Sequence, residues 1–162
     1  AREVGSSDIA YVQVEAVLAQ CDLFLNEGAA LQEKTQKAQK SWAQKEQNLQ
    51  AEAAQLQKKY QKGLITTNDA QAQQQSIEKR VASYQSSAQK EAQALDEENY
   101  VFTNRAQDLL HRAVQEINGD KKYKLIINAT ALIDADSTLN ITPAVLAKVN
   151  ELYAADKKAV KK

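Results

Sequence analysis

Side chains able to carry out catalysis are scarce in this sequence of 162 residues. His111 is the only histidine and Cys21 the only cysteine, and they lie far apart in the chain. A metal site or an activated nucleophile needs several such groups close together. We interpret His111 as structural rather than as a metal ligand or general base. We interpret Cys21 as a small apolar core residue rather than as a redox-active or intermolecularly bonded thiol. The sequence therefore predicts no catalytic residue, no metal, no cofactor and no enzymatic activity.

Lysines and apolar side chains occur together near residue 60. They could contact a partner molecule or a membrane surface, because they offer cations and apolar area at one place. The alternative is that Leu64 and Ile65 only close a turn over Tyr60. The residues of this candidate surface are Lys58, Lys59, Tyr60, Lys62, Leu64 and Ile65.

A second group of lysines precedes this surface. These lysines could pair with acidic residues of a neighbouring helix and otherwise face solvent, or they could face a bound partner. The group consists of Lys34, Lys37, Lys40 and Lys45.

Charge and composition limit the class of protein. Lys and Arg number 21, and so do Asp and Glu, so no overall field drives binding to nucleic acid or to a membrane. The 27 alanines and 20 glutamines, with only four glycines and one proline, are typical of long helices and argue against turn-rich sandwiches and barrels. No run approaches the roughly 20 apolar residues that span a bilayer.

The central part of the chain predicts two long helices. Trp42, Leu49 and Leu56 follow one another at intervals of seven, which is the spacing of a coiled-coil seam, although Lys45 occupies one of its core positions. After Gly63, the pair Thr66 and Asp69 resembles a capping box at the start of a second helix. This second helix is expected to end at Asn118 and Gly119.

If the two helices form an antiparallel hairpin, the numbers of facing residues should sum to about 133. This register brings apolar residues and opposite charges together, and it leaves Trp42 opposite Ala88 and Ala92. We therefore predict a helical hairpin over residues 31–118 with its tip near 63–68. The expected pairs are Leu56 with Ile77, Leu49 with Tyr84, Ala38 with Leu95, Lys34 with Glu98, Lys37 with Asp96, and Glu52 with Arg80.

The two ends of the chain, residues 1–30 and 119–162, predict a small β/α body. Its expected elements are strands at 8–14, 124–128, 131–135 and 138–141, a short helix at 15–25 that Gly28 separates from the long one, and a helix that begins at Thr142-Pro143 and ends in a frayed basic tail at 157–162. About 70 residues in two pieces are marginal for an independent core. We therefore expect this body to form an oligomer through Ile9, Tyr11, Val12, Val14, Leu125, Ile126, Ile127, Leu132, Ile133, Leu146 and Val149.

Three segments resemble a known family. They read Ile-Ala-Tyr-Val-Gln-Val-Glu-Ala-Val-Leu-Ala-Gln at 9–20, Tyr-Lys-Leu-Ile-Ile-Asn-Ala at 123–129, and Asn-Ile-Thr-Pro-Ala-Val-Leu-Ala-Lys-Val-Asn at 140–150. Together with the Gln/Lys/Ala-rich hairpin between them, they resemble the Skp/OmpH family of periplasmic chaperones. The likeness covers nearly the whole chain. The best-known members are strongly basic, whereas this chain is formally neutral.

The resemblance implies a fold that is mainly α with a small β body, a jellyfish-like homotrimer from which three coiled-coil arms project. It also implies an ATP-independent holdase that keeps unfolded outer-membrane proteins in a cavity between the arms, in the periplasm. Weak contact with a membrane or lipopolysaccharide is left open, and nucleic acid is not an expected partner. Because the chain begins at Ala1 and lacks methionine, we expect an export signal to have been removed.

Two other functions remain as alternatives. The first is a structural coiled-coil adaptor of the cell envelope that docks one folded partner. The second is a protein that binds anionic surfaces through its lysines, which the neutral net charge disfavours.

Overall fold

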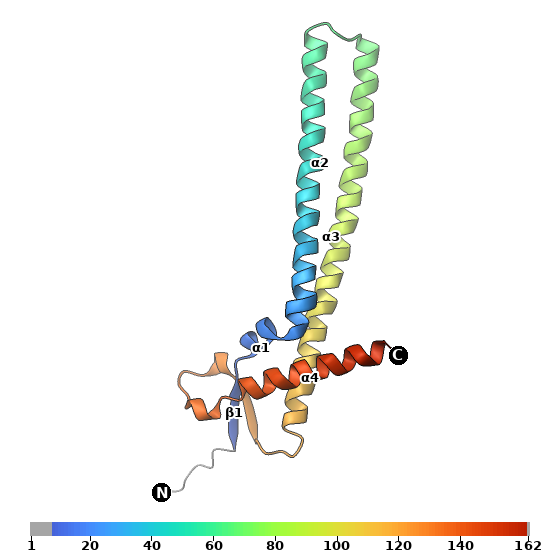
Figure 1. The fold of residues 1–162 in the computed structure, drawn as a ribbon. Helices are drawn as coiled ribbons and strands as arrows, with labels where there is room; N and C mark the ends of the chain where they lie inside the picture. Colours follow the sequence, from blue (N-terminus) through green and yellow to red (C-terminus); the bar gives the residue numbers. More distant parts are fainter. Residues whose placement is uncertain (1–7, 162) are drawn as a thin grey trace. The chain divides into compact units, whose positions relative to one another are not determined.

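The computed structural model describes residues 8–161, and it is mainly helical with a small strand region (Figure 1). The chain divides into two compact units. The body unit comprises Ala1–Ala30 and Tyr100–Lys162, and the hairpin unit comprises Leu31–Asn99. In chain order the elements are β1 (Ile9–Val12), α1 (Val14–Gln20), the π-helix η1 (Phe24–Gly28), α2 (Ala29–Gln61), α3 (Thr67–Ile117), β2 (Leu125–Asn128), the 3-10 helices η2 (Ala129–Ala131) and η3 (Ser137–Leu139), and α4 (Thr142–Val160).

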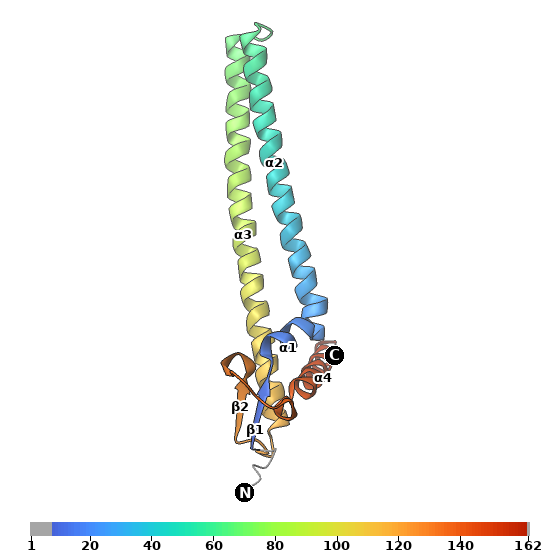
Figure 2. The ribbon, with the colours of Figure 1, turned by 90° about the vertical axis from the view of Figure 1, so that its left-hand side faces the viewer.

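Within the hairpin unit, α2 and α3 run antiparallel beside one another (Figures 1 and 2). The register predicted from the sequence is confirmed by two ion pairs between the helices, Lys34 with Glu98 and Arg80 with Glu52. The seam is thin, since only four of residues 31–99, all of which are described, are buried. They are Ala38, Leu56, Ile77 and Leu95. The predicted pair of Lys37 with Asp96 is wrong, because Lys37 reaches back to Glu33 one turn earlier in its own helix, at 3.0 Å.

The turn between α2 and α3 follows the local chemistry of its residues. Gly63 has a φ of 71°, which a residue without Cβ adopts at no steric cost. The amide N–H of Leu64 donates to the carbonyl oxygen of Lys59 at 2.9 Å, and that of Gly63 donates to Tyr60 at 3.1 Å, so α2 ends in a Schellman motif. The hydroxyl oxygen of Thr66 accepts from the amide of Asp69 at 3.1 Å, which confirms Thr66 as the N-cap of α3.

In the body unit, β1 pairs with β2 as a two-stranded parallel sheet in which Ile9 lies beside Leu125 and Tyr11 beside Ile127. Alternation of side chains gives the sheet two unlike faces. Ala10 and Val12 are buried on one face, whereas Ile9 and Leu125 on the other are 43% and 51% exposed. The first strand is shorter than the predicted 8–14, because α1 already begins at Val14.

The core of the body unit brings together residues from both ends of the chain. Helix α4 contributes Val145, Val149, Leu152 and Tyr153 to this core. The start of α4 is held to the end of β1 where the hydroxyl oxygen of Thr142 accepts a 2.9 Å bond from the amide of Gln13. The remaining buried members of the cluster are Val12, Val17, Cys21, Leu23, Leu109 and Ala113.

The strands predicted at 131–135 and 138–141 are wrong. The side-chain oxygens of Asn128 and Asp136 accept bonds from the amides of Thr130 and Thr138, at 3.3 and 2.9 Å. Such Asx turns favour tight helical turns over extended strand, and η2 and η3 begin there. Asn140 contributes only an isolated bridge to Tyr11. The frayed tail predicted at 157–162 is also wrong as far as it is described, because α4 continues to Val160.

Two glycines have roles other than those predicted. Gly28 does not separate two helices, since η1 leads directly into α2; it is buried where a Cβ would lie 2.9 Å from the rings of Phe24 and Phe102. The predicted helix at 15–25 accordingly divides into α1 and part of η1. Helix α3 ends at Ile117, and after it Lys121, not Gly119, adopts a positive φ of 55°.

Candidate functional site

The tip of the hairpin unit exposes apolar and cationic groups together. Leu64 is 69% exposed and Tyr60 48% exposed, so neither is covered by the turn, whereas Ile65 is partly buried. The tip lysines, Lys58, Lys59 and Lys62, are exposed, and within residues 8–161 no carboxylate lies within ion-pair distance of them. Leu64 therefore does not cover Tyr60, whereas the partial burial of Ile65 agrees with the alternative that it closes the turn.

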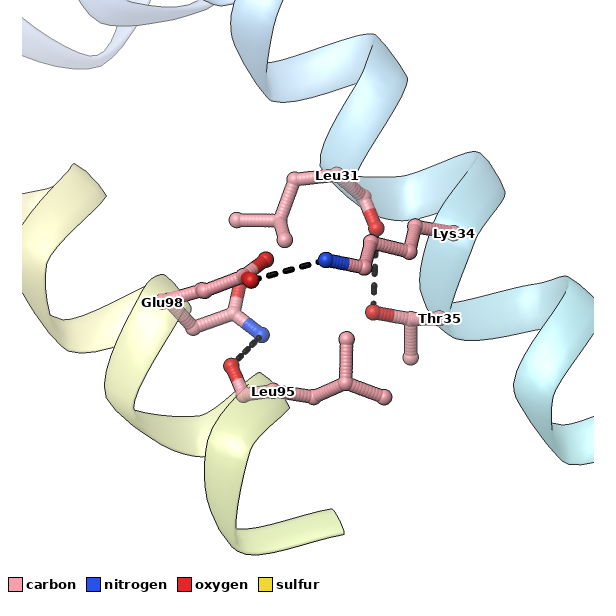
Figure 3. Close-up of polar contacts among 6 residues, drawn as sticks. Leu31, Lys34, Thr35, Leu95 and Glu98 are labelled. Carbon is pink, nitrogen blue, oxygen red and sulfur yellow. Dashed lines mark hydrogen bonds and ion pairs between the residues drawn. The ribbon is translucent and has the colours of Figure 1, made fainter. Parts of the chain in front are cut away.

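The four lysines of α2 divide into two kinds. Lys34 points across the hairpin to Glu98, with 2.7 Å between Nζ and Oε1, and the neighbouring Thr35 hydroxyl donates to the carbonyl of Leu31 (Figure 3). Lys37 pairs along its own helix, whereas Lys40 and Lys45 have no ion-pair partner among the described residues. Lys45 is exposed, so the core position that the heptad pattern gives it is not filled. Because these pairs are exposed, each contributes only about 0–1 kcal/mol.

A polar contact missed by the sequence analysis joins the helices in the middle of the hairpin. The indole N–H of Trp42 donates to Oε2 of Glu91 at 2.8 Å, and the hydroxyl of Tyr84 donates to the carbonyl oxygen of Trp42 at 3.0 Å. The sequence did carry the signal, since 42 and 91 sum to 133. Nearer the tip, the guanidinium of Arg80 lowers the pKa of the Glu52 carboxyl below its ordinary value.

The predicted oligomerisation residues are placed on different parts of the body unit. Val12 and Val149 belong to the core of this chain, and Val14, Ile126, Leu132 and Leu146 are partly buried. Ile9, Tyr11, Leu125 and Ile127 share the outer face of the sheet, and Ile133 is fully exposed in the segment between η2 and η3. The outer face is thus an apolar surface that the described part of this chain leaves at least partly open.

The body unit also contains a charged network that the sequence did not predict. The carboxylate of Glu27 accepts bonds from the guanidinium of Arg105 at 2.8 and 3.3 Å and from the hydroxyl of Tyr153 at 2.7 Å. The bonds from Arg105, then from Tyr153, lower the pKa of Glu27 although partial burial opposes them. Arg112 and Asp156 form a second pair beside it, with bonds of 2.8 and 3.2 Å. The network ties η1, α3 and α4 together within the body unit.

The two residues considered for catalysis lie in unlike surroundings. Cys21 is buried in the core, and its thiol lies 3.5 Å from the carbonyl oxygen of Leu18. His111 is exposed on α3. Among residues 8–161, no three His, Cys, Asp or Glu side chains come close enough to hold a metal ion, and no helix is long and apolar enough to cross a membrane.

The comparisons with known proteins agree with the arrangement of long helices and a small sheet. The family model described as outer membrane protein (OmpH-like) matches residues 8–149, and the chain belongs to this family. No curated protein matches the chain in sequence. A crystal structure from Caulobacter crescentus, described as that of an OmpH-like outer membrane chaperone, superposes with a TM-score of 0.74 and 17% identity, covering 89% of this chain and 84% of the other. At this identity the superposition shows a shared fold. Membership of the family supports a general function as a chaperone of outer membrane proteins.

Proposed function

We propose that this protein is an ATP-independent periplasmic holdase that binds unfolded outer-membrane proteins and prevents their aggregation. The observation that carries the proposal is the family match over residues 8–149. The hairpin unit supports it, because a 69-residue segment with four buried side chains offers most of its surface to other molecules. The proposed activity consists of binding and release of the client, without catalysis, metal or cofactor.

Client contacts are proposed to be distributed along the hairpin unit. The exposed Leu64 and Tyr60 supply apolar area at the tip, and the lysines without ion-pair partners among the described residues supply positive charge beside it. Each contact can be weak, because several contacts made at once raise the effective concentration of the others. Reversible capture then needs no energy source. The proposed client-binding residues are Lys34, Lys37, Lys40, Lys45, Lys58, Lys59, Tyr60, Lys62, Leu64 and Ile65.

The body unit is proposed to form a homotrimer. Support comes from the outer face of the sheet, where Ile9 and Leu125 lie side by side and remain about half exposed. Apolar area of this kind is stabilised when another chain covers it. Three hairpin units in one assembly would give a client several surfaces at the same time.

An aggregation assay tests the proposal. An outer-membrane β-barrel unfolded in urea is diluted into buffer with and without the protein, and turbidity is followed while light scattering gives the mass of the chaperone. We expect suppressed turbidity and a mass of three chains. A monomer that leaves turbidity unchanged would contradict the proposal. A trimer that leaves turbidity unchanged but binds one folded envelope protein at fixed stoichiometry would favour the adaptor.

A tip variant makes the assay more specific. Leu64→Ser removes apolar area from a residue that packs on little of its own chain, so the fold should be kept. We expect more of this variant than of the wild type to be needed for the same protection. Val160→Ser, at a position in the body unit that is 86% exposed, is the control for loss of exposed apolar area and should protect as the wild type does.

A further inference from the structure

A groove of about 620 Å³ opens between α2 and α3 near the tip of the hairpin unit. Its volume falls within the roughly 300–1,000 Å³ typical of ligand sites. Leu56 is buried, and Ala53 and Ala70 are partly buried, so they form the floor. The complete lining is Ala53, Ala54, Leu56, Gln57, Tyr60, Thr67, Ala70, Gln71 and Gln74.

The groove exists because small residues occupy the seam where large ones would fill it. On either side of the buried layer of Leu56 and Ile77, the groove is floored by the small, partly buried Ala53 and Ala70, and the larger Ile65 is partly buried at the turn. Tyr60 could fill the space, but it is 48% exposed and its hydroxyl lies 3.5 Å from that of Thr67. The seam near the tip is therefore incompletely filled by its own chain.

The chemistry of the lining restricts what can bind. None of the described residues that line the groove carries a charged side chain. Its exposed members include Gln57, Gln71 and Gln74, and each primary amide offers both donors and an acceptor. Gln74 donates a long bond of 3.3 Å to Glu78, whereas the side chains of Gln57 and Gln71 have no hydrogen-bond partner among the described residues. A charged ligand would find no counter-charge in this groove, and a purely apolar one would not use the amides.

An extended polypeptide has the matching groups, because its main chain alternates N–H and C=O while its side chains alternate between two faces. We propose that this groove binds an extended, uncharged polypeptide segment, with one apolar side chain against Leu56 and Ala70 and main-chain amides paired with Gln57 and Gln71. The inference rests on the proposed function, since an unfolded client exposes such segments, and it names the chemistry that is recognised. Binding here is insensitive to salt, unlike binding through lysines.

A blocked, uncharged peptide in which leucine alternates with serine is the probe, and its affinity is measured by fluorescence anisotropy with an uncharged dye. The test variant is Gln57→Glu with Gln71→Glu. The matched control is Gln55→Glu with Gln73→Glu, which adds the same charge on the same helices at exposed positions outside the lining. We expect at least tenfold weaker binding for the test variant and less than a twofold change for the control. Wild-type affinity should change less than twofold between low and high salt.

A second variant tests the groove in case the double glutamate variant does not fold. Ala70→Leu fills the groove and should also weaken binding tenfold, whereas Ala82→Leu, exposed on the same helix, should not. Circular dichroism checks that all variants keep their helices. The proposal is overturned if the wild type does not bind the peptide, or if test and control variants weaken it equally.

Other occupants give other results. Equal affinity for a peptide with N-methylated main chain, or full competition by a nonionic detergent, would mean that an acyl chain or bare apolar group is recognised and would overturn the proposal. Self-association that the test variant abolishes would assign the groove to a second copy of this chain and would overturn the proposal.

The aggregation assay, run in parallel, separates the groove proposal from the holdase proposal. If the peptide binds but the barrel is not protected, the holdase proposal is contradicted and the groove proposal stands. If the test variant still protects the barrel and binds the peptide with unchanged affinity, the groove proposal is overturned and the holdase proposal stands.

Discussion

Tyr153 and Glu27 lie 126 positions apart in the sequence, and the tyrosine hydroxyl donates a 2.7 Å hydrogen bond to Oε2 of the glutamate. Tyr153 is 4% exposed, whereas the side chain of Glu27 is partly open and also binds Arg105. A residue of α4 is thus joined to η1, which leads into α2. The bond therefore ties the two ends of the chain together through a buried side chain.

Removing the hydroxyl of Tyr153 should destabilise the body unit. A hydrogen bond to a charged group contributes about 1.5–3 kcal/mol. Because the carboxylate is partly exposed, we expect Tyr153→Phe to cost about 1 kcal/mol. Urea unfolding followed by circular dichroism gives the free energy. Tyr100→Phe, at an exposed position on α3, is the control and should change it by less than about 0.5 kcal/mol. Equal effects would mean that the bond contributes nothing.

Acid should weaken the fold through Glu27. The bonds from Arg105 and then from Tyr153 hold its pKa below the ordinary value of 4.5, so the folded state binds the proton less tightly than the unfolded state. The stabilisation is therefore present above about pH 4.5 and is lost as the pH falls through the lower, folded pKa. Asp156, whose pKa Arg112 lowers, acts in the same direction.

The measurement is the midpoint of urea unfolding at a series of pH values from 7 to 3. We expect a flat region down to about pH 5 and a decline below it. Glu27→Gln should start from a lower midpoint and decline less steeply. A variant that is less stable but declines as steeply as the wild type would assign the acid sensitivity to other carboxyl groups.

Gly28→Ala should destabilise the body unit even though alanine favours helices. The added Cβ would lie 2.9 Å from ring atoms of both Phe24 and Phe102, closer than Cβ contacts normally come. Overpacking costs about 1–3 kcal/mol, and the gain in helix propensity offsets about 1 kcal/mol of it. The melting temperature should fall by about 2–4 °C for each net kcal/mol. An unchanged or higher melting temperature would show that the two rings move aside freely.

Leu56 and Leu64 should respond differently to the same truncation. Leu56 is 6% exposed in the seam and Leu64 is 69% exposed at the tip. Leu56→Ala should cost about 2 kcal/mol, the lower end of the range for a core leucine, because the groove beside it already leaves space. Leu64→Ala should stay within about 0.5 kcal/mol. Thermal unfolding of both variants measures the two losses of stability. Similar losses of stability would indicate that Leu64 packs against another chain.

The long helices and their register could be predicted because many weak signals agree over a long window. Helix-forming residues, heptad spacing and two opposite-charge pairs all favour one pairing, and an error of one turn would separate Lys34 from Glu98 and Arg80 from Glu52. The tip could be predicted for a different reason, because Gly63 and Thr66 belong to well-defined local motifs.

Short segments after residue 128 could not be predicted in this way. Apolar residues at 131–135 and 138–141 favour strands, but single side chains, Asn128 and Asp136, decide the local backbone by accepting amide bonds. The Glu27 network and the groove near the tip depend on side-chain positions that only the packed chain defines. For the groove, the sequence shows only that two of its floor residues, Ala53 and Ala70, are small.

The pairing of β1 with β2 has a consequence for the order of folding. Ile9 meets Leu125, so the sheet closes a loop of more than a hundred residues, whereas the turn at Gly63 brings its neighbours together over a few residues. Contacts between distant residues form slowly because the entropy of loop closure must be overcome first. Zippering of α2 and α3 from the turn shortens that loop step by step. In a chain made from its N-terminus, β1 remains without its partner strand until most of the protein has been synthesised, so the apolar first strand is itself an unfolded segment in need of protection.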